Sequence, residues 1–132
     1  MDSWVAITGG CGYVGSHIAA EIKRTTKTKV LVIDNRAKAL AHTHQWADRV
    51  IHNSYDSDEA LGALASVHPK AVIHCAAASL VGPSVTDPAR YYGTNVAGML
   101  TLLDHMRRHK INNVIFSSSS SCLLYTSDAA DE

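Results

Sequence analysis

The residues with the clearest chemical pattern are three glycines near the start of the chain. The stretch "TGGCGYVGSH" places Gly9, Gly12 and Gly15 at the spacing G-x-x-G-x-x-G, directly after an apolar run. Glycines at this spacing permit a tight strand-to-helix turn, bring the backbone close to a pyrophosphate and let the helix pack on the strand. The N-terminus of that helix offers N–H groups to the phosphates. The pattern predicts a dinucleotide-binding turn.

An acidic residue at the end of the next apolar run supports this prediction. In "KVLVIDN", Asp34 follows the glycines at the position, about 20 residues on, where a carboxylate accepts hydrogen bonds from an adenosine ribose and repels a 2′-phosphate. This favours NAD over NADP, although Arg36 nearby leaves NADP open. The alternative is that the glycines serve only a sharp turn and that Asp34 is a surface loop residue.

Serines and a tyrosine near the other end raise the question of acid–base chemistry. The chain ends in "FSSSSSCLLYTSDAADE", where Tyr125 is the only tyrosine. A phenol with a pKa near 10 is protonated at neutral pH, so a tyrosine base needs a cation about one helical turn away. Because no lysine or arginine follows Lys110, we do not expect Tyr125 to be a catalytic base.

The elements that position these residues alternate along the chain. Five apolar runs predict buried strands, at residues 4–8, 29–35, 49–53, 71–77 and 112–118. Helical patterns cover residues 13–23, 57–68 and 87–109, and the segment between 35 and 49 could hold a short helix. With no hairpin signal between the strands, this order predicts an α/β protein with a Rossmann-type doubly wound parallel sheet. No helical pattern follows residue 117, so we expect only the five N-terminal βα units of a Rossmann-type sheet.

Composition excludes several other functions. The 132 residues carry 12 basic and 12 acidic side chains, so no net charge attracts nucleic acid, and no apolar run approaches the roughly 18 residues of a membrane span. Three widely spaced cysteines fit a reducing cytoplasm rather than a disulfide framework. His105 and His109 are four apart, but with no third ligand nearby we expect no metal site.

Several separated stretches, between Trp4 and Ser119, resemble the extended short-chain dehydrogenase/reductases and, within them, the UDP-glucose 4-epimerases. They are "ITGGCGYVGSH", "VIDN", "VIHCAAASLVGPSVTDPARYYGTNVAGMLTLLDHM" and "VIFSSSS". The combination of V-G-x-S-V-x-x-P with Y-Y-x-x-N-V-x-G is the most specific of these and points to epimerases rather than to sugar-nucleotide dehydratases.

The resemblance implies a site that holds NAD as a prosthetic group. It assigns cofactor contacts to Gly9, Gly12, Tyr13, Val14, Gly15, Asp34, Asn35, Asn53, Ser54, Cys75, Ala76, Ala77, Ser79 and Asn95. It also makes Ser119 a catalytic residue, hydrogen-bonded to the 4-oxygen of the sugar. Three positions depart from the pattern: Asn53 stands where an aspartate is usual, Ser79 where some epimerases have lysine, and Thr94 where many have asparagine.

The activity implied by the resemblance is the interconversion of UDP-galactose and UDP-glucose through a 4-keto sugar. A tyrosine in a Y-x-x-x-K motif removes the proton of the 4-hydroxyl group while NAD accepts a hydride. The implied partners are a UDP-sugar and a second copy of the full-length protein. Two alternatives stay open: another nucleotide-sugar epimerase, dehydratase or decarboxylase, and a non-catalytic NAD-binding protein.

The last eleven residues, "CLLYTSDAADE", resemble the in-frame translation of a sequencing adapter. We therefore expect residues 1–121 to be the N-terminal portion of an NAD-binding domain and residues 122–132 to be a non-native tail. On this interpretation the substrate domain is missing and the chain is inactive. The alternative is a natural acidic terminus.

Overall fold

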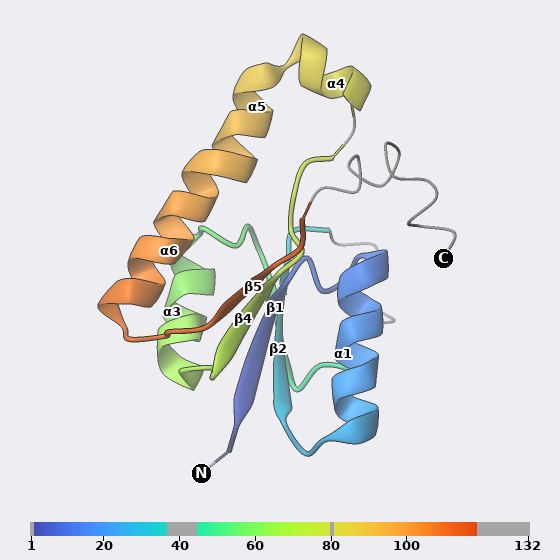
Figure 1. The fold of residues 1–132 in the computed structure, drawn as a ribbon, viewed down its shortest axis with the longest axis vertical. Coiled ribbons are helices and arrows are strands. Elements are labelled where there is room, and N and C mark those ends of the chain that lie inside the picture. Colours follow the sequence, from blue (N-terminus) through green and yellow to red (C-terminus); the bar gives the residue numbers. More distant parts are fainter. Residues whose placement is uncertain (1, 37–44, 80, 119–132) are drawn as a thin grey trace.

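The core of the protein is a five-stranded parallel sheet. The computed structural model describes residues 2–36, 45–79 and 81–118. Its strands are β1 (Trp4–Thr8), β2 (Lys29–Asp34), β3 (Arg49–His52), β4 (Ala71–His74) and β5 (Val114–Phe116), in the spatial order β3-β2-β1-β4-β5 (Figure 1). Every neighbouring pair is parallel. The predicted Rossmann-type sheet is confirmed.

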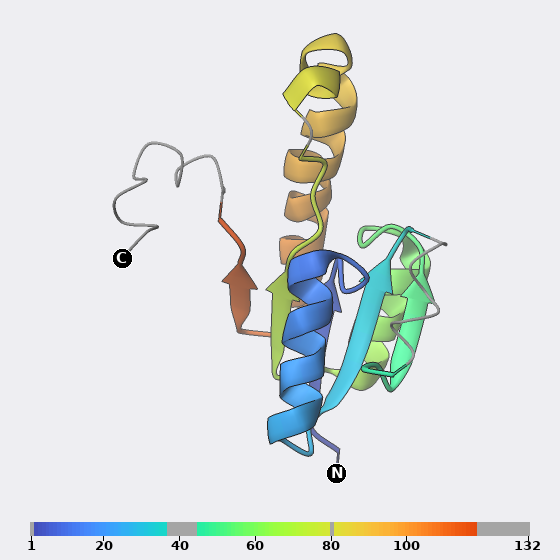
Figure 2. The same cartoon turned by 90° about the vertical axis from the view of Figure 1, so that its right-hand side faces the viewer.

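Helices cover both faces of this sheet, which is why its central strands are continuously apolar. On one face, α1 (Tyr13–Thr25) places Ala19 against Val5, Ile7 and Val30. On the other face, α3 (Asp58–Val67) and α6 (Gly98–Arg108) contribute Leu64 and Leu102 to a core that includes Leu31, Ile33 and Val72. Figures 1 and 2 show α1 on the opposite side of the sheet from α3 and α6.

The strand register brings the functional segments to one edge of the sheet. Thr8 at the end of β1 is paired with Ile33 of β2 on one side and with His74 of β4 on the other. The segments that follow these three strands therefore begin side by side at the carboxyl edge. This edge is where open α/β sheets bind ligands.

The helix after β3 begins and ends as its sequence predicts. Ser57 is the N-cap of α3 and its hydroxyl oxygen accepts a hydrogen bond from the backbone N–H of Ala60 at 3.2 Å. Two acidic residues, Asp58 and Glu59, occupy the first turn, where the helix dipole favours negative charge. The prediction of a capped helix at this place is confirmed.

The segment between β4 and β5 differs from the prediction of one continuous helix over residues 87–109. A short helix that the sequence did not predict, α4 (Val81–Thr86), precedes α5 (Pro88–Tyr92). A π-helical turn, η2 (Gly93–Ala97), then joins α5 to α6. The long helix therefore contains a change of hydrogen-bonding pattern in its first half.

Several boundaries also differ, among them β5, which covers Val114–Phe116 instead of the predicted residues 112–118. Strand β2 ends at Asp34, β3 at His52 and β4 at His74, each before the predicted end, because the chain leaves the ladder there to line the carboxyl edge. The short helix predicted between residues 35 and 49 falls mainly on residues 37–44, outside the described residues. Within the described parts of the chain, no helix is long and apolar enough to cross a membrane.

Candidate functional site

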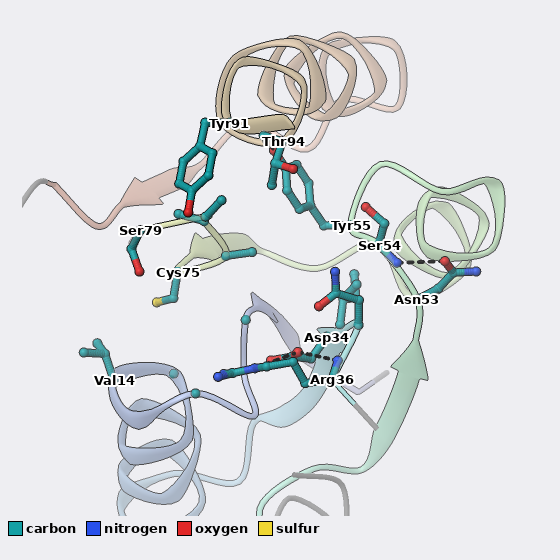
Figure 3. Close-up of a pocket in the computed structure, with 18 of the residues that line it drawn as sticks. Val14, Asp34, Arg36, Asn53, Ser54, Tyr55, Cys75, Ser79, Tyr91 and Thr94 are labelled. Carbon is teal, nitrogen blue, oxygen red and sulfur yellow. Dashed lines mark hydrogen bonds and ion pairs between the residues drawn. The ribbon is translucent and has the colours of Figure 1, made fainter. Parts of the chain in front are cut away.

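A cavity of about 570 Å³ opens at the carboxyl edge of the sheet (Figure 3). This volume lies within the usual range for small-molecule sites. The cavity brings together the glycine turn, the end of β2, the segment after β3 and the loop after β4. All the residues to which we assigned cofactor contacts line it, with the exception of Asn95.

The glycine turn forms a closely packed floor. Gly9 has φ +68°, and a Cβ on it would lie 2.8 Å from the backbone nitrogen of Ala76. A Cβ on Gly15 would collide with the backbone oxygen of Gly9. Gly12 precedes α1 as its N-cap, without a hydrogen bond from a capping side chain. Larger residues at Gly9 and Gly15 would therefore push apart the backbone segments that form this floor.

The carboxylate of Asp34 ties the end of β2 to the glycine turn. It is nearly fully buried and accepts hydrogen bonds from the backbone N–H groups of Cys11 at 3.0 Å and Arg36 at 2.9 Å. An ionised carboxylate has about four lone-pair sites. Asp34 therefore keeps acceptor capacity for the hydroxyl groups of a ribose.

The side chain of Arg36 extends from Asp34 across the glycine turn (Figure 3). Its Nε lies 3.6 Å from Oδ1 of Asp34, and its Nη2 lies 2.7 Å from the place where a Cβ on Gly12 would be. The side chain is 60% exposed. Thus a cation stands beside the N-terminus of α1 and offers a partner to an anionic group bound there.

The departure at Asn53 has a structural reason. The Nδ2 of Asn53 donates a hydrogen bond to Oε2 of Glu59 at 3.2 Å, and its Oδ1 accepts one from the backbone N–H of Ser54 at 2.8 Å. An aspartate at this position would place two carboxylates in contact. The asparagine therefore suits an acidic first turn of α3, while Asn53 and Ser54 both keep their place on the cavity wall.

The loop after β4 is fixed to β1 at its beginning. The backbone N–H of Cys75 donates to the carbonyl oxygen of Thr8 at 3.0 Å, and that of Ala76 donates to Thr8 Oγ1 at 3.2 Å. The same hydroxyl group lies 2.7 Å from Nδ1 of His74. Because Thr8 Oγ1 accepts from Ala76, its own proton is available to a neutral His74 imidazole.

Burial sets the protonation of two groups beside this loop. It raises the pKa of the Cys75 thiol and lowers the pKa of His74. The thiol is therefore protonated at neutral pH, the form in which a cysteine is a poor nucleophile. The imidazole of His74 is neutral under the same conditions.

Asn95 contacts the loop rather than the cavity. Its Oδ1 accepts a hydrogen bond from the backbone N–H of Ala78 at 2.9 Å, and its Nδ2 donates one to the carbonyl oxygen of the same residue at 2.8 Å. This pair of bonds holds the far end of the loop against η2. The assigned role of Asn95 as a cofactor contact stays a prediction, and the structure gives it a positioning role.

Other cavity-lining residues were not among the predicted contacts. They are Ile33, Arg36, Tyr55, Ala78, Pro83, Arg90, Tyr91 and Thr94. Arg36 and Thr94 had signals in the sequence, as the basic residue near Asp34 and as a departure from the family pattern. Tyr55 had none, because its contact with Thr94 joins residues 39 positions apart.

Two predicted features lie elsewhere. Ser119 and Tyr125 fall outside the described residues, so the catalytic role of Ser119 stays a prediction. The imidazole rings of His105 and His109 contact each other, with centroids 4.3 Å apart. In the described ranges, no group of three or more histidine, cysteine or acidic side chains has the arrangement of a metal site.

Comparison with known proteins agrees with this geometry. The model of the NAD dependent epimerase/dehydratase family matches residues 5–129. The UDP-glucose 4-epimerase of Halalkalibacterium halodurans is 37% identical over 118 residues, which cover 88% of this chain and 34% of that protein. The UDP-glucose 4-epimerase of Corynebacterium glutamicum is 40% identical over 114 residues, covering 86% and 34%. The solved UDP-glucose 4-epimerase from Brucella ovis in complex with NAD has a TM-score of 0.76 at 36% identity, covering 89% of this chain and 36% of that one.

The fold and the cavity define a dinucleotide-binding type of α/β protein. The match of the family model over nearly the whole sequence shows that the chain belongs to the NAD dependent epimerase/dehydratase family. The chain spans about a third of the length of the curated bacterial relatives named above. The matched range ends inside residues 122–132, and the non-native origin of that segment stays a prediction.

Proposed function

We propose that this chain is the cofactor-binding part of an NAD-dependent UDP-glucose 4-epimerase. The observation that carries the proposal is the cavity that joins the glycine turn and Asp34 to the loop after β4. Its floor is a backbone so closely packed that a Cβ at Gly9 or Gly15 would collide with neighbouring backbone atoms. This floor fits a pyrophosphate, and the buried carboxylate of Asp34 fits the hydroxyl groups of an adenosine ribose.

The residues of the chain would bind and orient the cofactor. The N-terminus of α1 would hold the pyrophosphate, and Asp34, with Arg36 beside it, would lie at the adenosine ribose. The loop of residues 75–79 would then lie along the nicotinamide side. When bound, NAD supplies a hydride acceptor for carbon 4 of a hexose.

The substrate proposal depends on the relatives. Two relatives are named UDP-glucose 4-epimerases, and a solved relative from Stenotrophomonas maltophila holds NAD and a formylated UDP-arabinopyranose, at 27% identity and a TM-score of 0.80 over 90% of this chain and 38% of that one. We infer that the parent protein interconverts UDP-galactose and UDP-glucose. Because Tyr125 has no basic residue after it, the 132-residue chain should not turn over a UDP-sugar.

Isothermal titration calorimetry of the 132-residue chain tests cofactor binding. We expect saturable binding of one NAD per chain, weaker binding of NADP, and a loss of NAD affinity of about ten- to a hundredfold in Asp34→Ala. Asp104→Ala removes an exposed carboxylate that pairs with Arg107 and Arg108 on α6, and should bind NAD as the unmodified chain does. Absence of NAD binding by the unmodified chain would refute the proposal.

Incubation of the chain with NAD and UDP-galactose tests the second part. We expect no UDP-glucose to form, because the proposed acid–base pair is absent. Turnover by the purified chain would show that another residue acts as the base.

The parent protein is proposed to be a cytoplasmic homodimer. Four apolar side chains, at helical spacing, are exposed along α5, η2 and α6: Tyr92, Val96, Leu100 and Leu103. A stripe of this kind suits a helix-to-helix contact between two copies. Sedimentation velocity should show a concentration-dependent dimer that Leu100→Glu weakens and Thr101→Glu leaves intact. A monomer at every concentration, for the full-length parent as well as for this chain, would contradict the dimer.

A further inference from the structure

Tyr55 lies at the junction between the cavity loop and the π-helical turn. Its side chain is only 4% exposed, and its hydroxyl group donates a hydrogen bond to the backbone carbonyl of Thr94 in η2. Figure 3 shows Tyr55 and Thr94 directed toward each other above the loop that carries Cys75. Burial, with the nearby Asp56 carboxylate, raises the pKa of Tyr55 to about 12. The hydroxyl group is therefore protonated at neutral pH and able to donate.

The helix is shaped to receive this hydroxyl group. A Cβ on Gly98 would lie 2.6 Å from Tyr55 Oη, so a glycine is required where the ring approaches α6. The backbone N–H of Gly98 donates to the carbonyl of Gly93, the longer i→i+5 bond of a π turn. Helices depart from the regular α pattern where a side chain enters the hydrogen-bond ladder. Tyr55 is such a side chain, and the turn forms around its contact with Thr94.

The π turn in turn positions the loop at the cavity. Asn95, the residue after Thr94, makes both of its side-chain hydrogen bonds to Ala78. The Tyr55 ring also contacts His74 edge-on, with centroids 4.7 Å apart, and His74 reaches Ala76 through the hydroxyl group of Thr8. Both ends of the segment 76–78 are thus connected to one buried ring.

We propose that Tyr55 is a positioning residue that holds the cofactor-facing loop, residues 75–79, through the π-helical turn and Asn95. Its hydroxyl group fixes the carbonyl of Thr94, which sets the orientation of Asn95, which in turn holds Ala78. The importance of this arrangement for cofactor affinity rests on the proposed function. The bracing of the loop does not, because it is a property of the chain without a ligand.

The variant Tyr55→Phe keeps the ring and its contact with His74 but removes the hydroxyl group. We expect amide hydrogen exchange in residues 75–79 of the ligand-free chain to accelerate about three- to tenfold, the effect of losing one hydrogen bond. Exchange in β1 and β2 should accelerate less. The affinity for NAD should weaken about three- to tenfold.

Two further variants make the test specific. Tyr92→Phe removes the same atom from a ring that is 69% exposed at the end of α5, and should change neither exchange nor NAD affinity. Gly98→Ala keeps the tyrosine at position 55 but adds a Cβ that displaces its hydroxyl group, and should reproduce both effects of Tyr55→Phe.

The two measurements separate the possible failures. Equal acceleration in β1, β2 and the loop of Tyr55→Phe, or no acceleration in the loop, would overturn the bracing role. An unchanged NAD affinity with a loosened loop would overturn its importance for binding. If the unmodified chain does not bind NAD at all, the proposed function fails, and the exchange data still decide the role of Tyr55.

Discussion

The two walls of the cavity are built in different ways. The wall formed by β1, the glycine turn and β2 depends on backbone close to backbone, as at Gly9 and Gly15, and on one buried carboxylate. The opposite wall, the loop of residues 75–79, begins with a backbone hydrogen bond from Cys75 to Thr8 and is otherwise held by side chains from far away in the sequence, chiefly those of Thr8 and Asn95. Backbone contacts tolerate no added atoms, whereas side-chain contacts can be removed singly. Substitutions in the first wall should therefore damage the fold, and those in the second should loosen a loop.

The largest effect is expected from Gly15→Ala. The added Cβ would collide with the backbone oxygen of Gly9, and the turn cannot move away without shifting Gly10 as well. We expect the free energy of unfolding to fall by about 3 kcal/mol, measured by urea denaturation. Gly62→Ala is the matched control, because a Cβ there meets no atom within 4 Å and the helix should gain about 0.5 to 1 kcal/mol. Equal changes in the free energy of unfolding of the two variants would contradict the claim that the first wall depends on close backbone contacts.

A smaller and local effect is expected from Asn95→Ala. The variant removes both hydrogen bonds to Ala78, so the free energy of unfolding should fall by about 1 to 2 kcal/mol. In limited proteolysis, the loop of residues 75–79 should be cleaved earlier in the variant than in the unmodified chain. Strands β1 and β2 should stay protected in both. Asn112→Ala changes an exposed asparagine and should stay within about 0.5 kcal/mol. Cleavage in β1 or β2 at the same rate as in the loop would show that the two walls are not independent.

A pH dependence should arise in the second wall. Burial lowers the pKa of His74 from its ordinary value of 6.5, so the folded state binds fewer protons than the unfolded state in the interval between the two values. The stabilisation is complete above pH 6.5 and is lost as the pH falls through the lowered pKa. We expect the free energy of unfolding to decrease over this interval. His74→Asn keeps a hydrogen-bond partner for Thr8 but does not titrate, so it should reduce the slope of the free energy of unfolding against pH. A slope unchanged by this substitution would assign the effect to His105, whose pKa burial also lowers.

The smallest effect on stability is expected from Arg36→Ala in the first wall. The ion pair with Asp34 involves an exposed guanidinium at 3.6 Å, so the free energy of unfolding should change by less than about 0.5 kcal/mol. The affinity for NADP should fall more than that for NAD, because the guanidinium is the available partner for a 2′-phosphate. Equal losses for the two cofactors in calorimetric titrations would place Arg36 at the shared pyrophosphate instead.

The same contrast explains how much of the fold the sequence predicts. The five strands, the glycine turn and the capping of α3 by Ser57 depend on local patterns, and their existence and order are confirmed. The π turn has no local sequence signal, and its contact with the hydroxyl group of Tyr55 joins residues 39 positions apart in the sequence. The short helix α4 also escaped prediction, since its sequence "VGPSVT" has a glycine, a proline and no helical stripe.

The candidate site shows the same division. Its glycines and Asp34 follow from a spacing with a mechanical reason, and the resemblance to epimerases supplied the loop after β4. The position of Asn95 behind that loop could not be predicted, because its two hydrogen bonds to Ala78 depend on how η2 lies over the sheet. The part played by Ser119 stays a prediction.

The strand β5 has a consequence for handling the purified chain. It forms one edge of the sheet, seen on the left in Figure 2, and Val114, Ile115 and Phe116 are all exposed. An apolar edge strand is a template for pairing with another molecule, and the formal net charge of +0 at pH 7 provides no long-range repulsion to prevent it. Colloidal stability should therefore be lowest near neutral pH, so concentrated stocks are best kept at a pH well away from 7.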